Sequence, residues 1–136
     1  MSNICKILRD LMKQTSIKVL DDKDREFIEA LRNLNVPRNV AMLITYLANV
    51  TETSSREIEL GTNLRQPEVS IAMRTLRQNN WANERNIKAE GKGRPTIVYK
   101  LRVPLESIIN HYEEKSKQES AQAMMSIQRL KELTAA

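Results

Sequence analysis

Apolar residues recur every three or four positions through most of the chain, the spacing that places them on one side of an α-helix. The pattern appears in residues 4–12, 21–34, 37–48, 56–62 and 67–80. Asp, Ser and Thr residues precede several of these stretches, and Pro37 and Pro67 are each expected in the first turn of the helix that they begin, as is typical of helix starts. The sequence therefore predicts a mainly helical protein up to residue 80.

After residue 80 the pattern changes to the short, β-branched and aromatic runs that are typical of strands. Residues 81–89, "WANERNIKA", and 96–101, "TIVYKL", are predicted to form two strands. The connection "EGKGRP" is longer than a tight hairpin turn needs, and it holds two of the chain's three glycines. The expected fold class is mainly α with a small β-hairpin (α+β), in a single domain over residues 1–136, since a chain of this length has little room for a second core.

The segment 104–136 is again helical in pattern. Its apolar residues at spacings of three and four are Leu105, Ile108, Ile109, Tyr112, Ala123, Met124, Ile127, Leu130 and Leu133. A continuous helix from Leu105 to Leu133 would be about 43 Å long, which is more than a small core can cover. We expect it to project and to pair with a second copy of the chain, with a partly frayed tail as the alternative.

The net charge of +5 is concentrated in the middle of the chain. Residues 56–102 contain ten basic and five acidic side chains, whereas the remainder has twelve of each. Such clustering favours a polyanionic partner, first of all nucleic acid. A solvated surface that only keeps the protein soluble is the alternative.

The order of these elements is that of a winged helix-turn-helix, and two segments resemble a known group. "EIELGTNLRQPEVSIAMRTLRQNNWA" resembles the helix-turn-helix of the winged-helix transcriptional regulators, in the TrmB, MarR and ArsR group, and "KGRPTIVYKL" resembles their wing. The resemblance covers roughly residues 30–103. It implies a helix-turn-helix at about 54–79, a wing at about 81–101 and binding to double-stranded DNA. Asn63 stands where glycine is usual in the turn, but asparagine tolerates a left-handed backbone.

The second helix of this motif divides into two sides. Val69, Ala72, Met73 and Leu76 are predicted to face inward, with Ile58, Leu64 and Trp81 as partners. The residues expected to contact DNA are Arg65, Gln66, Ser70, Ile71, Arg74 and Arg77 from the motif, with Lys92 and Arg94 from the wing. Glutamine and arginine can bond base edges bidentately, and an arginine can enter a narrow minor groove. The alternative is that these are only the polar residues that any amphipathic helix exposes.

No residue set points to catalysis. His111 is the only histidine and Cys5 the only cysteine, which is too few for a common zinc site. Phosphate-binding loops, nucleophile elbows and histidine-based triads are not found. We therefore expect no catalytic residues, no cofactor and no metal, and we place Trp81 and Tyr99 in the core and His111 at the surface or an interface. Without a membrane-spanning run or a signal peptide, a cytoplasmic location is expected.

Three functions remain open from the sequence. The first is a sequence-specific DNA-binding transcriptional regulator that acts as a homodimer. The others are a winged-helix protein-interaction module in a larger complex and a sequence-indifferent architectural DNA-binding protein. Gln66, Ser70 and Arg74 favour the regulator over the architectural protein, in which lysine would dominate, and the basic wing favours it over the interaction module.

Overall fold

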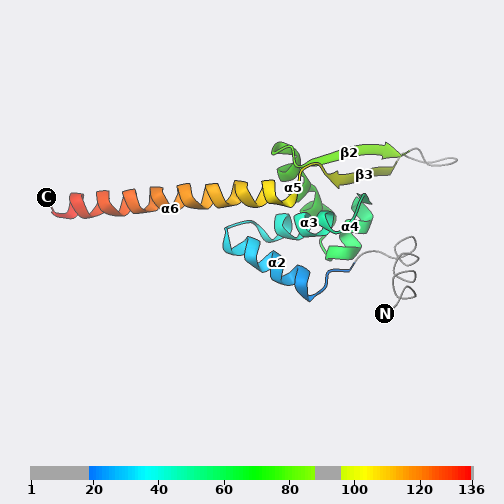
Figure 1. The fold of residues 1–136 in the computed structure, drawn as a ribbon, viewed down its shortest axis with the longest axis horizontal. Helices are drawn as coiled ribbons and strands as arrows, with labels where there is room; N and C mark the ends of the chain where they lie inside the picture. The colour runs from blue at the N-terminus through cyan, green and yellow to red at the C-terminus, as the bar shows by residue number, and fades with distance from the viewer. Residues whose placement is uncertain (1–18, 88–95, 136) are drawn as a thin grey trace.

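A computed structural model describes residues 19–87 and 96–135 of the chain (Figure 1). Its elements in chain order are α2 (Asp22–Asn33), α3 (Arg38–Ala48), β1 (Thr53–Ser54), α4 (Ser55–Thr62), α5 (Gln66–Gln78), β2 (Ala82–Ile87), β3 (Thr96–Leu101) and α6 (Leu105–Ala135). The expected class, mainly α with a small antiparallel hairpin, is confirmed. The helix predicted at 4–12 lies outside the described residues.

Helix α3 is the centre of the core. Seven of its eleven residues are buried, including Leu43 and Ile44, which have no exposed surface. Helices α2, α4 and α5 and strand β3 all contact it. Burial on nearly all sides explains why apolar residues occur around most of the circumference of α3 rather than along one stripe. Helix α3 therefore holds the other elements of the domain in place.

Helix starts follow the predicted signals with one difference. The Asp21 carboxylate caps α2 by accepting a hydrogen bond from the Asp24 backbone amide, and the Asp24 carboxylate accepts one from the Asp21 backbone amide. Both amides, which have no partner within the helix, are thereby bonded. Pro67 lies in the first turn of α5, as expected. Pro37, predicted in a first turn, is instead the N-cap of α3, one position before the helix begins. Its ψ of 145° is extended, so the residue lies outside the helix.

The strands form a three-stranded antiparallel sheet in the order β1-β3-β2. The wing strands β2 and β3 were predicted, but the two-residue strand β1 was not. Thr53 pairs with Tyr99 and Ser54 with Val98, so β1 joins the start of α4 to the wing. The hairpin is thereby fixed against the helix-turn-helix as well as to the end of α5.

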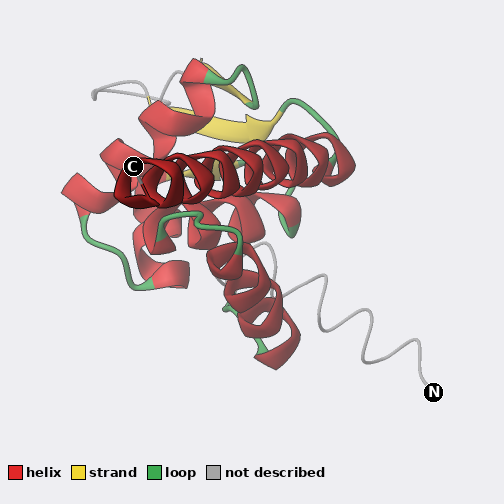
Figure 2. Ribbon diagram, turned by 90° about the vertical axis from the view of Figure 1, so that its left-hand side faces the viewer, coloured by secondary structure: helices red, strands yellow, loops and turns green. Residues whose placement is uncertain are grey.

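Helix α6 leaves the globular part and extends well beyond it (Figures 1 and 2). Its 31 residues correspond to about 46 Å, and only Ile108 and Tyr112 are buried. The prediction of one continuous, projecting helix is confirmed, and the frayed tail is not observed.

Candidate nucleic-acid interface

Three side chains and one special backbone position fix the start of α4 and the turn between α4 and α5. The hydroxyl of Ser54 accepts a hydrogen bond from the Glu57 backbone (3.3 Å), and the Glu57 carboxylate accepts one from the Ser54 backbone (3.2 Å). At the other end, Thr62 donates to the Ile58 carbonyl and accepts from the Leu64 amide. Asn63 has φ 63°, in the left-handed region, as predicted for this turn.

One side of α5 is buried in the core and fixes how the helix is presented. Val69, Ala72, Met73 and Leu76 are the buried residues of α5, and the predicted partners Ile58, Leu64 and Trp81 belong to the same cluster. The Asn39 side chain on α3 donates to the Glu68 carbonyl at 3.4 Å. Helix α5 is therefore held on two sides and turns its remaining side to solvent.

The six described residues that were predicted to contact DNA are all accessible to solvent: Arg65, Gln66, Ser70, Ile71, Arg74 and Arg77. Gln66, Ser70 and Arg74 follow each other at intervals of four, and neighbours at this interval lie side by side on a helix. The Gln66 amide nitrogen is 3.4 Å from the Ser70 hydroxyl. Ile71, 54% exposed, lies next to this row, which we call the α5 row (Gln66, Ser70, Arg74). An exposed isoleucine beside polar side chains suits a surface that contacts both polar and methyl groups.

Arg77 lies on the same side of α5 as the α5 row, one turn beyond Arg74, but it is engaged with a carboxylate. Its guanidinium lies 3.5 Å from the Glu84 carboxylate on β2, so it bridges α5 and the wing. The local sequence of α5 and of β2 does not predict this contact, because the two residues come together only in the folded structure. Lys92 and Arg94, the predicted contacts of the wing, lie outside the described residues.

A second ion pair joins the segment before α4 to the wing. The guanidinium of Arg85 on β2 donates to both carboxylate oxygens of Glu52, at 2.6 and 2.7 Å. These hydrogen bonds, together with the nearby charges of Arg85 and Lys100, lower the pKa of Glu52, and the same pair raises the pKa of Arg85. The sequence reasoning missed Glu52, since its contact depends on β1 joining the sheet.

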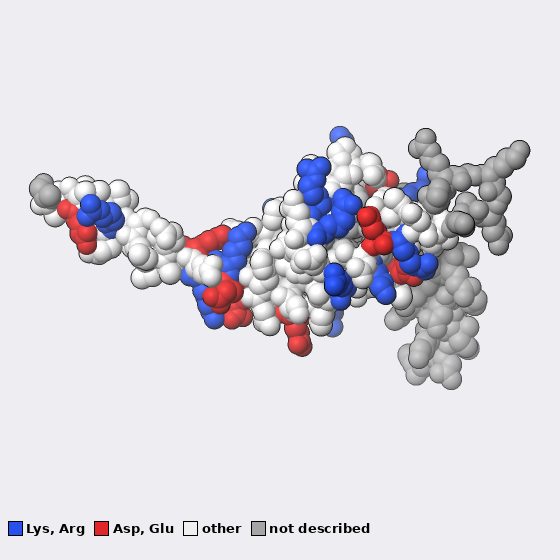
Figure 3. Space-filling view, turned by 90° about the horizontal axis from the view of Figure 1, so that it is seen from above, with Lys and Arg blue, Asp and Glu red and all other residues white. Residues whose placement is uncertain are grey.

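The pairings change how the basic charge of the middle segment is distributed. Arg77 and Arg85 are engaged with carboxylates, whereas Arg56, Arg65, Arg74 and Arg102 form no ion pair with any residue that the structure describes. Figure 3 looks down on the side that carries β2 and β3, and Lys and Arg side chains gather there over the globular part. Cations on α4 and α5, at the start of α5 and just after β3 are thus available to a polyanion.

Trp81 is a core residue, as predicted, and is 6% exposed. Its ring packs edge-on against His111, with centroids 5.0 Å apart, and against Tyr112, at 5.5 Å. Burial raises the pKa of Tyr112. The three rings attach the start of α6 to the end of α5, so Trp81 does not present a face for base stacking. His111 is exposed but takes part in this junction, and Tyr99 is partly buried.

Neither a metal-binding group nor a membrane-spanning helix is found among the described residues. Across 19–87 and 96–135, no three His, Cys, Asp or Glu side chains are grouped so as to hold a metal ion. No helix in these ranges is long and apolar enough to cross a membrane.

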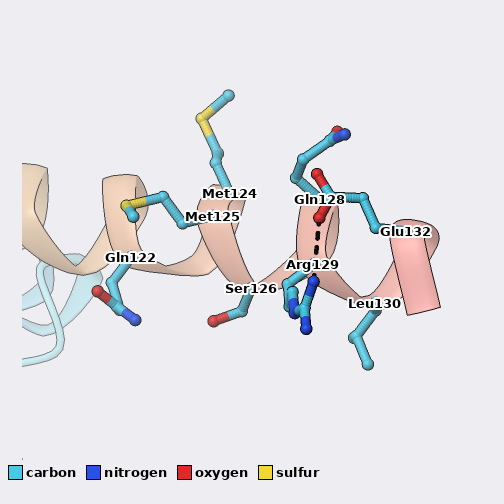
Figure 4. A pocket seen from close by; sticks show the side chains of 8 residues that line it. All are labelled: Gln122, Met124, Met125, Ser126, Gln128, Arg129, Leu130 and Glu132. Carbon is cyan, nitrogen blue, oxygen red and sulfur yellow. Dashed lines mark hydrogen bonds and ion pairs between the residues drawn. The ribbon is translucent and has the colours of Figure 1, made fainter.

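A shallow hollow lies far out on α6 and is lined by that helix alone (Figure 4). Met124 and Met125 project from one part of the helix and Leu130 from another, with an Arg129–Glu132 ion pair between turns. A single helix supplies only one wall, so this region is a surface rather than an enclosed cavity.

Comparison with solved structures finds similarity to a MarR family regulator from Neisseria meningitidis. The two chains are 13% identical, the match covers 98% of this chain and 94% of that chain, and the TM-score is 0.45. No protein-family model matches the chain, and no curated protein matches it. The order of helices and strands described above is that of a winged helix-turn-helix domain.

Proposed function

We propose that this protein is a sequence-specific, double-stranded DNA-binding transcriptional regulator that places α5 in the major groove. The observation that carries the proposal is the α5 row, which stands on the exposed side of a helix whose other side is buried. A helix that reads bases needs this division, because one side must be anchored while the other reaches the base edges.

Each residue of the proposed reading surface has a suitable chemistry. Arg74 can donate two hydrogen bonds to O6 and N7 of a guanine, and Gln66 can pair with an adenine. Ser70 between them is short enough to let the helix approach the groove, and Ile71 can contact a thymine methyl group. Arg65, the N-cap of α5, is proposed to contact a phosphate, as arginines do beside base-reading helices.

The wing is proposed to contact the DNA beside the major groove. The stem formed by β2 and β3 is joined to α4 through β1 and to α5 through the Arg77–Glu84 pair. A hairpin attached in this way moves with the recognition helix. Lys92 and Arg94 would then contact phosphates or the minor groove.

The outer half of α6 is proposed to pair with a second copy. Positions 105, 108, 109 and 112 lie on the same side of a helix as 123, 127 and 130, at roughly 100° per residue. The side that packs on the core at the start of α6 therefore continues outward, where Ile127 is 52% and Leu130 62% exposed. A homodimer would cover this surface and place two α5 helices on neighbouring half-sites. We assign the protein no catalytic role and expect it to act in the cytoplasm.

The test is selection of bound fragments from a genomic DNA pool, followed by affinity measurements on the selected duplex and on random duplexes at two salt concentrations. A regulator should prefer its selected site by at least about 10³-fold. Equal affinity for all duplexes would identify an architectural DNA-binding protein. Absence of DNA binding would favour a protein-interaction module.

A further inference from the structure

The stem of the wing contains an acidic residue at the edge of a basic surface. Glu52 is the residue before β1, and Arg85 lies on β2, 33 positions later. Both carboxylate oxygens are used, and the arginine and glutamate side chains keep 61% and 30% of their surface exposed. A bidentate pair of this kind has a fixed geometry, unlike most surface ion pairs.

Glu52 faces two cations rather than one. The register of β1 with β3 matches Thr53 to Tyr99, so an extension by one residue sets Glu52 beside Lys100. Lys100 contributes to the lowered pKa of Glu52, which is consistent with this placement. Arg85 lies opposite Val98 on the other side of β3, so the Glu52 side chain reaches across the middle strand. The carboxylate thus binds Arg85 directly and offsets one of the two positive charges at the base of the wing.

We propose that Glu52 is a specificity-determining residue, which lowers the affinity for DNA of arbitrary sequence by withholding Arg85 from phosphates. The proposal rests on the proposed DNA-binding function. Sequence-independent affinity comes from cations that contact phosphates, and a carboxylate that occupies one of these cations reduces it. Contacts between the α5 row and bases are unaffected, so the ratio of specific to non-specific affinity rises.

The experiment measures how the affinity of the full chain for a random-sequence duplex depends on salt. Glu52→Gln should bind this duplex more tightly, with the log–log slope steeper by about 0.9 for each additional phosphate that the protein neutralises. Arg85→Gln alone should not have a steeper slope than the wild type, because the cation that it removes is already occupied and Glu52 is then left to offset Lys100. Glu52→Gln combined with Arg85→Gln should show a smaller increase than Glu52→Gln alone, because Arg85 is no longer there to bind a phosphate. Glu52→Asp, which keeps the charge, should behave as wild type.

Glu119→Gln is the matched control, because Glu119 is exposed on α6, forms no ion pair with a described residue and carries the same charge. Its slope should equal that of the wild type. A folded Glu52→Gln protein with an unchanged slope, or an equal increase in Glu119→Gln, overturns the inference. So does a double variant, Glu52→Gln with Arg85→Gln, whose slope is smaller than that of the wild type, because removal of an already neutral pair should cost no phosphate contact. This comparison also decides the matter if Glu52→Gln alone does not fold. A wild-type chain that binds no duplex overturns the proposed function itself.

Discussion

The globular part of the molecule and the outer part of α6, residues 113–135, both carry apolar side chains at helical spacing but differ in what covers them. In α3, Leu43 and Ile44 are fully buried by neighbouring helices and the sheet. On α6, Met124 is 71% and Leu130 62% exposed. The periodicity predicts that each helix has an apolar side. The periodicity does not indicate whether that apolar side is buried by other parts of the same chain.

The largest expected effect is a difference in stability between two leucine-to-alanine substitutions, one in each region. Leu43→Ala removes a fully buried side chain and should lower the free energy of unfolding by about 2–5 kcal/mol. Leu130→Ala, in the monomer, should change it by less than about 0.5 kcal/mol, because the residue is exposed there. Urea unfolding at low protein concentration compares the two. Similar losses would contradict the distinction between the regions.

A charge on the outer surface of α6 tests whether a second copy covers it. Ile127→Glu should convert a dimer into a monomer, since pairing would bury an unpaired carboxylate. Sedimentation measures the assembly, and circular dichroism should show an unchanged helix content. Gln122→Glu, a charge change at the edge of the hollow, is the control. A wild-type chain that is monomeric would remove α6 from this role.

A smaller effect is expected at the start of α4. The Ser54 hydroxyl caps this helix, so Ser54→Ala should cost about 1 kcal/mol of stability. Ser54→Gly should cost only about a few tenths of this, because glycine also suits the extended backbone of an N-cap. Urea unfolding of both variants tests the cap. Equal losses would mean that the hydroxyl does not contribute.

The smallest effect concerns pH. The folded state lowers the pKa of Glu52 from its ordinary value of 4.5, mainly through hydrogen bonds from Arg85. The pair therefore stabilises the fold above that value, and this contribution is lost as the pH falls through the lowered pKa. Between neutral and strongly acidic pH, the unfolding midpoint should fall slightly more for the wild type than for Glu52→Gln. An identical pH dependence would show that the pair does not contribute to stability.

Most of the fold and the exposed side of α5 could be predicted because both depend on local chemistry. Asn63 tolerates the left-handed turn, and four buried positions of α5 share one side of the helix. The ion pairs of Arg77 and Arg85 could not be predicted, since each depends on how strands and helices meet. Strand β1 has two residues, which is too short for any alternating pattern. Whether a second copy covers α6 is equally not encoded in the local sequence.

The central claim is that the α5 row contacts base edges, and Arg74 offers the most direct test. In the selected duplex, each guanine is replaced in turn by 7-deazaguanine, which lacks the N7 acceptor. Arg74→Ala should bind the unmodified duplex more weakly than the wild type by about 1–3 kcal/mol. At the guanine that Arg74 contacts, the replacement should weaken binding of the wild type but should not weaken binding of Arg74→Ala any further. Base reading by α5 would be contradicted if the losses of affinity from the replacement and from Arg74→Ala were additive at every guanine. It would also be contradicted if Arg74→Ala lost as much affinity for random DNA as for the selected duplex.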